Sequence, residues 1–112
     1  MSAPWPVRLE FRRGARVLHA AFDDGAAFDI PFELLRVESP SAEVQGHNPA
    51  DKRLVLGKAD VGVTGAHPVG RYAVRIVFDD GHDTGIYPWG LLRRFGEEGA
   101  ALLAAYRARA AG

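Results

Sequence analysis

Alternating hydrophobic and polar residues predict strands in the first part of the chain. VRLEF (residues 7–11) places an apolar side chain at every second position, which is the period of a half-buried strand. An Arg-Gly pair interrupts this pattern, and RVLHAAF (16–22) predicts a second strand. Asp24-Gly25 is typical of a tight hairpin turn, because glycine tolerates the positive φ that such turns require. AFDI (27–30) therefore predicts a short third strand.

The order of features in this segment recurs later in the chain. PFELLRV (31–37) predicts a short helix, since proline lacks the N–H that the first helical turn leaves unpaired. FDDGAAFDIPFELLR (22–36) matches FDDGHDTGIYPWGLLR (78–93) with one residue inserted, and a hairpin pattern precedes each copy, at 8–22 and at 58–78. We therefore predict two ββ-plus-helix pseudo-repeats.

These pseudo-repeats favour a small single α+β domain over residues 1–112, with antiparallel strands covered by short helices and a core region at 7–95. Residues 38–53, between the copies, are rich in Pro, Gly, Ser and Asn and predict a loop. LVLGK (54–58) is a candidate for one more strand. The predicted core residues are Leu9, Phe11, Phe28, Ile30, Leu35, Val74, Ile76, Phe78, Trp89 and Leu92.

An alanine-rich stretch at the end of the chain predicts a C-terminal helix over 97–111. Gly96 directly precedes it and is interpreted as the residue that ends the helix of the second copy. Leu102, Leu103 and Tyr106 share one side of the C-terminal helix, so we expect this side to dock onto the domain. Partner recognition through the same face is the alternative.

Charge and composition narrow the classes of function. The 14 basic residues balance the 14 acidic ones, so nucleic acid and anionic membranes are not expected as partners. The chain has no cysteine, which excludes disulfides, thiolate nucleophiles and cysteine-based zinc sites. It also lacks a signal peptide and any apolar run near the roughly 20 residues that span a bilayer, so a cytoplasmic location is expected.

His82 is the residue whose chemistry is hardest to interpret, because Asp79, Asp80 and Asp83 surround it in the sequence. The first copy has Ala26 at the same position, so the turn itself needs no histidine, and a solvent-exposed turn residue is the favoured interpretation. A catalytic base needs a nucleophile within hydrogen-bond reach, and no Gly-x-Ser-x-Gly setting occurs. No spacing of histidines or carboxylates matches a zinc or calcium motif.

Two stretches together resemble a known family: LRVESPSAEVQGHNP (35–49) and FDDGHDTGIYPWGLL (78–92). They are similar to the N-terminal domain of γ-butyrobetaine hydroxylase and trimethyllysine hydroxylase, and especially to standalone bacterial proteins built from that domain alone. The resemblance covers roughly Val7 to Phe95 and implies a strand-rich α+β domain. The iron and 2-oxoglutarate chemistry of the hydroxylases belongs to a separate, larger domain, so the resemblance does not imply that activity here.

In the hydroxylases this domain resembles a zinc module with a Cys-Pro-Cys-x-x-Cys arrangement and one distant histidine. The cysteine positions fall on Ser39, Ser41 and Val44 here, and the histidine falls on His82. Serine hydroxyls stay protonated near neutral pH and valine has no donor atom, so we expect a degenerate site without zinc and no cofactor.

These observations predict a non-catalytic interaction or accessory module that binds an unknown protein partner. Ser39, Ser41 and His47 are expected to lie near His82 in one polar surface patch without metal. The alternative is a small metal- or ligand-binding protein that uses His82 with His47. Some relatives are fused to ATPases of iron–sulfur assembly, which suggests an accessory role near cofactor biogenesis. The candidate interaction surface comprises His82, Asp83, Tyr87, Trp89, His47, Ser39 and Ser41.

Overall fold

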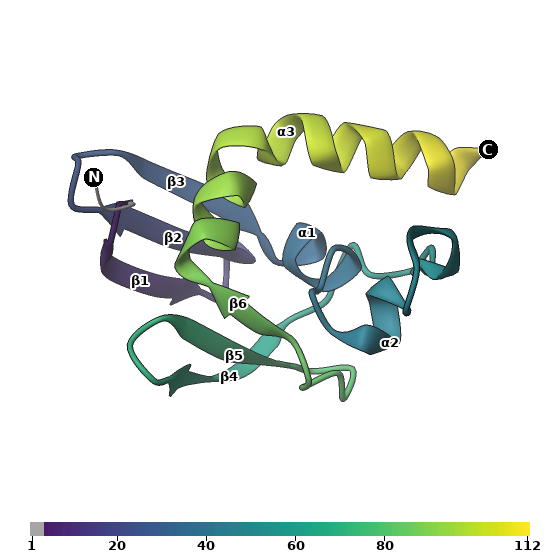
Figure 1. Ribbon diagram of the computed structural model, residues 1–112. Coiled ribbons are helices and arrows are strands. Elements are labelled where there is room, and N and C mark those ends of the chain that lie inside the picture. Colours follow the sequence, from purple (N-terminus) through teal and green to yellow (C-terminus); the bar gives the residue numbers. More distant parts are fainter. Residues whose placement is uncertain (1–3) are drawn as a thin grey trace.

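A computed structural model describes residues 4–112, except for the side chain of Pro49, and contains two antiparallel three-stranded sheets (Figure 1). The strand orders are β1-β2-β3 and β4-β5-β6, so neighbours in sequence are neighbours in each sheet. The elements are β1 (Pro6–Arg12), β2 (Val17–Phe22), β3 (Ala27–Pro31), α1 (Phe32–Val37), α2 (Ala42–Gln45), the 3₁₀ turn η1 (Pro49–Asp51), β4 (Val63–Val69), β5 (Ala73–Phe78), β6 (Ile86–Pro88) and α3 (Trp89–Ala111). The α+β prediction is confirmed.

The two copies of the repeat share the same order of turn, strand and helix. The amides of Gly25 and Gly81 each donate a hydrogen bond to the carbonyl oxygen of the phenylalanine three residues earlier, at 3.1 and 3.2 Å. Their φ angles are +90° and +92°, values that glycine adopts without steric cost. Pro31 and Pro88 are the last strand residues and the N-caps of α1 and α3. The helices therefore begin one residue after each proline, rather than at it as predicted.

Each copy is bound to the other by an arginine on its helix. Arg36 of the first copy donates from Nε to Asp80 Oδ2 of the second copy at 2.8 Å. In the reverse direction, Arg93 of the second copy donates from Nη1 to Asp24 Oδ1 of the first copy at 3.0 Å. The Asp-Asp-Gly turn and the Leu-Leu-Arg helix thus recur together because each turn of one copy holds the helix of the other.

The predicted helix boundary at Gly96 is wrong, because α3 runs without interruption from Trp89 to Ala111. A Cβ atom on Gly96 would lie 2.5 Å from Cγ of Phe28 on β3, far inside van der Waals contact. Glycine at this position therefore permits close packing of the helix on the first sheet rather than ending the helix. Beyond it, Tyr106 donates to the carbonyl oxygen of Val55 at 2.6 Å, so the expectation that this part of the helix docks onto the domain is confirmed.

The segment between the copies is more ordered than the predicted loop, since it contains α2 and η1. Residues 54–58 form no strand. The first helix ends at Val37, before Ser39-Pro40, because the residue preceding a proline disfavours the helical conformation. In the second copy no proline follows, and α3 continues past the equivalent point.

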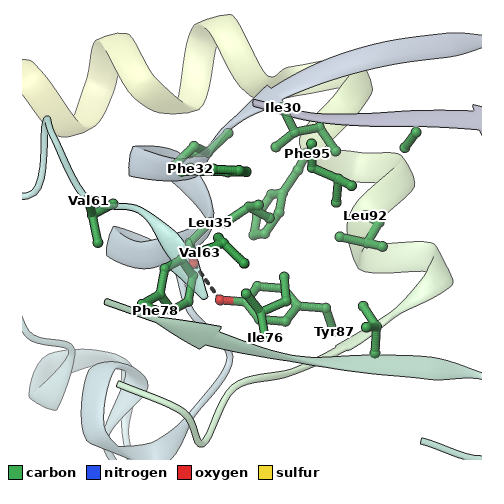
Figure 2. Packing of buried hydrophobic residues seen from close by; sticks show 14 of the residues in the cluster. Ile30, Phe32, Leu35, Val61, Val63, Ile76, Phe78, Tyr87, Leu92 and Phe95 are labelled. Atoms are coloured by element: carbon green, nitrogen blue, oxygen red, sulfur yellow. Dashed lines mark hydrogen bonds between the residues drawn. The ribbon is translucent and has the colours of Figure 1, made fainter. Parts of the chain in front are cut away.

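The hydrophobic core lies between the two sheets and the helices (Figure 2). Six of the predicted core residues are buried, namely Ile30, Leu35, Val74, Ile76, Phe78 and Leu92, and four are partly buried against them, namely Leu9, Phe11, Phe28 and Trp89. Tyr87, expected on the surface, is fully buried, and its hydroxyl donates to the carbonyl oxygen of Leu35 at 2.5 Å, the dashed line of Figure 2. Tyr87 aligns with Ile30 in the repeat, which is the signal that places it in the core.

Across residues 4–112, none of the helices combines the length and apolar character that crossing a membrane requires.

Candidate functional site

A polar cluster connects the loop after α1 to the turn after β5, and it comprises Ser39, Ser41, Glu43 and His82. Nε2 of His82 lies 2.9 Å from Oγ of Ser39 and 3.4 Å from Oγ of Ser41. Nδ1 of the same ring lies 3.0 Å from Oε2 of Glu43 on α2. The cluster thus joins residues that are about forty positions apart in the sequence, and it ties the connecting segment to the second copy.

The partners of His82 determine the direction of these hydrogen bonds. An ionised carboxylate only accepts, so Nδ1 of His82 carries the hydrogen that is donated to Glu43. In the neutral ring Nε2 then accepts a hydrogen bond from the hydroxyl of Ser39. Oγ of Ser39 itself accepts from the backbone N–H of Ser41 at 3.3 Å. Every polar atom of the imidazole therefore has a partner within the chain.

Serine, histidine and glutamate in this order and spacing resemble a hydrolase triad, which the sequence pattern did not reveal. The burial of the three groups is the reverse of what catalysis requires. Ser39 is completely buried and the side chain of His82 is 3% exposed, whereas that of Glu43 is 63% exposed. A nucleophile must be accessible to its substrate, but in this cluster solvent reaches Glu43 and does not reach Ser39.

Ser39 is also enclosed by the second copy. A Cβ atom on Gly85 would lie 2.6 Å from Oγ of Ser39 and 3.0 Å from Cε1 of Tyr87. The absence of a side chain at Gly85 therefore allows the backbone before β6 to approach the serine. Burial raises the pKa of the Tyr87 phenol, which keeps the hydroxyl protonated as a hydrogen-bond donor.

The structure brings together only part of the predicted surface. Ser39 and Ser41 contact His82 as expected, but all three are buried, so the prediction of an exposed patch and of an exposed turn histidine is wrong. His47 and Asp83 are exposed. The backbone carbonyl oxygen of Asp83 accepts from Nη1 of Arg75. Among the described residues, His47 makes no hydrogen bond to the cluster.

Trp89 is half-buried, and its indole N–H donates to the carbonyl oxygen of Arg71 at 2.7 Å. Its ring meets Trp5 edge to face, with centroids 6.2 Å apart. The third large residue at this end of the molecule is Tyr72, whose carbonyl oxygen accepts from the backbone N–H of Trp89. Trp5 and Tyr72 are 48% and 59% exposed, and we refer to these two residues together with Trp89 as the aromatic surface.

The residues present do not fit a zinc ion. The positions that the family resemblance assigns to zinc ligands do lie near one another at Ser39, Ser41 and His82, but the hydroxyls are already hydrogen-bonded to the ring. The fourth position is the buried apolar Val44. No group of three or more histidine, aspartate or glutamate side chains in the described part of the chain could hold a metal.

Asp80, two residues before His82, is paired with two basic side chains. Oδ2 of Asp80 is 2.8 Å from Nε of Arg36 and 2.7 Å from Nζ of Lys58, and Oδ1 accepts from the backbone N–H of His82. Partial burial acts to raise the pKa of Asp80, but the hydrogen bonds from Lys58, His82 and Arg36 outweigh it and hold this pKa well below its usual range. Asp80 is therefore ionised and fixed at neutral pH.

Known structures share this architecture. A solution NMR structure is 38% identical with a TM-score of 0.84, covering 99% of this chain and 87% of its own. A second is 44% identical with a TM-score of 0.82, covering 96% and 80%. A crystal structure of a protein of unknown function from Acidithiobacillus ferrooxidans ATCC 23270, described as a member of the DUF971 family, is 38% identical with a TM-score of 0.72, covering 85% and 98%.

Comparison with curated proteins gave no match. Among protein families, the sequence model described as "Gamma-butyrobetaine hydroxylase-like, N-terminal" matches residues 9–93, which include both copies of the repeat and the polar cluster between them. This match covers most of the chain, and the three solved structures extend the likeness to the fold. The chain therefore belongs to the family of γ-butyrobetaine hydroxylase-like N-terminal domains.

Proposed function

We propose that this protein is a non-catalytic interaction module of the cytoplasm that binds a protein partner through its aromatic surface. The observation that carries the proposal is the exposure of Trp5 and Tyr72 beside the half-buried Trp89. Tyrosine and tryptophan offer a large apolar area and a polar edge at small entropic cost, and they dominate the energetic centres of protein interfaces. Folding alone does not require Tyr72 to be aromatic, because the residue is 59% exposed.

The arrangement around His82 supports the non-catalytic part of the proposal. Its two ring nitrogens bind Ser39 and Glu43, and the serine has no exposed surface. We interpret the cluster as a structural connection between the segment after α1 and the second copy. A fluorophosphonate probe, which reacts with activated serines, is then expected to leave Ser39 unmodified. Stoichiometric labelling of Ser39 would contradict this interpretation.

Photo-crosslinking in the native host tests the interaction directly. A photoreactive phenylalanine analogue at position 72 is expected to capture one defined protein, and the same analogue at exposed Leu56 serves as the control. The purified partner should then bind the wild-type chain and lose roughly 30-fold in affinity with Trp5→Ala plus Tyr72→Ala, as for an interface hot spot. Leu56→Ala should bind as the wild type does. Equal affinity for all the variants would refute the aromatic surface as the binding site.

A further inference from the structure

A pocket of about 320 Å³ opens beside the polar cluster, between α1, α2 and the segment before β4. It is lined by Arg36, Glu43, Val44, Arg53, Leu54, Val55, Lys58 and His82. Three of these side chains are cationic, and three are aliphatic. The pocket therefore combines a positively charged side with an apolar side, which is the combination that a small organic anion requires.

The guanidinium of Arg36 has donors that the protein does not use. Its side chain is 12% exposed, Nε binds Asp80, and Nη1 is buried without a partner among the described residues. Buried donors are normally paired, because an unpaired one loses its hydrogen bonds to water without compensation. Within residues 4–112, Nη1 of Arg36 is the one buried side-chain polar atom without a hydrogen-bond partner, and Arg36 lines the pocket.

The equivalent arginine of the second copy, Arg93, has all of its side-chain nitrogens paired. Arg93 directs Nε to Glu97 at 3.0 Å, and its two terminal nitrogens bind Asp24 at 3.0 and 2.9 Å. All three of its nitrogens therefore have carboxylate partners within the chain. Arg36 occupies the matching position in the repeat but has one carboxylate partner, which it shares with Lys58. The two copies therefore differ in that Arg36 has one carboxylate partner where Arg93 has two.

The charged groups around the pocket leave a net positive charge. Asp80 is shared between Arg36 and Lys58, and Glu43 faces His82, so one positive charge remains when the imidazole is counted as neutral. Arg53 provides it: its backbone N–H binds the carbonyl oxygen of Val44 at 2.7 Å, and within residues 4–112 its guanidinium has no carboxylate partner. The backbone of Arg53 is thus held in place, while its exposed guanidinium is free to bind a ligand.

We propose that this pocket binds the carboxylate or phosphate group of a small organic molecule. Arg53 takes the anionic oxygens, because a guanidinium matches the geometry of either group, and the positive charge of Arg36 in the wall of the pocket adds to the attraction. Val44, Leu54 and Val55 contact the apolar remainder of the ligand. This site is separate from the aromatic surface and does not depend on it.

An NMR titration of the ¹⁵N-labelled full chain at constant ionic strength tests the proposal, with inorganic phosphate and isovalerate as separate probes. We expect saturable amide shifts at Val44, Arg53 and Lys58 with at least one probe. A response to phosphate alone identifies a phosphorylated ligand, and a response to isovalerate identifies a carboxylate. Arg53→Gln should weaken the binding about tenfold or more, as for a lost charge-assisted hydrogen bond.

Arg71→Gln is the matched control, because Arg71 is also exposed and lies outside the pocket. It removes the same charge and should bind the probe as the wild type does. Two results would overturn the site: the absence of saturable shifts with both probes, or equal weakening by the two variants, which would indicate general attraction to positive charge. Amide spectra of both variants verify that they fold, and neither arginine takes part in the core.

Discussion

Replacing Gly96 with alanine tests how α3 packs on the first sheet. In an exposed helix interior this change would stabilise the protein by about 1 kcal/mol, because alanine is the better helix former. At Gly96 the new Cβ would lie 2.5 to 2.9 Å from three atoms of Phe28. The phenylalanine cannot easily move aside, because its ring packs edge to face on Phe22 and the guanidinium of Arg93 lies over it.

Overpacking of this kind costs about 1–3 kcal/mol, so we expect a net loss of about 1–2 kcal/mol in the free energy of unfolding. Gly90 of the same helix provides the control, since a Cβ there has no atom within 4 Å. Gly90→Ala should stabilise the protein by roughly 0.5–1 kcal/mol. Urea unfolding measures both, with the midpoint falling for Gly96→Ala and rising for Gly90→Ala at a constant slope. A rise for both would refute the close packing and restore the helix end at Gly96.

Three further predictions follow from the same contacts. Trp89→Ala should lower the free energy of unfolding by about 2–3 kcal/mol, as measured by urea unfolding. This loss is smaller than for a fully buried tryptophan, because Trp89 is half-buried. A change under about 0.5 kcal/mol would contradict its packing role. Asp80 has a lowered pKa in the folded state, so its contribution to stability is present above the unfolded pKa of about 4 and is lost as the pH falls below it. Asp80→Asn should therefore reduce the dependence of stability on pH below about pH 4, and an unchanged dependence would be inconsistent with the ion pairs. A strong chelator should leave the melting temperature unchanged, whereas a large fall would restore the zinc interpretation.

The repeat in the sequence predicted most of the fold, because it marks features that local physics determines. Turn glycines, prolines directly before helices and alternating strands can be recognised in a sequence without knowledge of their distant contacts. Gly96 was misinterpreted because a glycine that ends a helix and a glycine that admits a neighbouring ring look the same in sequence. The contact with Phe28 that distinguishes them spans most of the chain.

The candidate site was predicted in part. The meeting of Ser39 and Ser41 with His82 followed from the family resemblance and not from composition or spacing. The burial of His82 was missed because its counterpart Ala26 suggested an exposed turn. The two copies differ because Pro40 ends the first helix early and frees the following segment to cover the turn of the second copy. Glu43 carried no signal of its own, since its role depends on that tertiary contact.

We propose that His82 is a structural residue that connects the two parts of the chain, rather than a reactive one. The free energy of unfolding of His82→Ala tests it most directly, because this variant places in the second copy the residue that the first copy has at Ala26. Loss of the buried contact to Ser39 and of the part-buried contact to Glu43 predicts a destabilisation of about 2–3 kcal/mol, while exposed His67→Ala should change stability by less than about 0.5 kcal/mol. Catalytic and ligand-binding residues are typically neutral or costly to stability, so a His82→Ala variant as stable as the wild type, or more stable, would contradict the account.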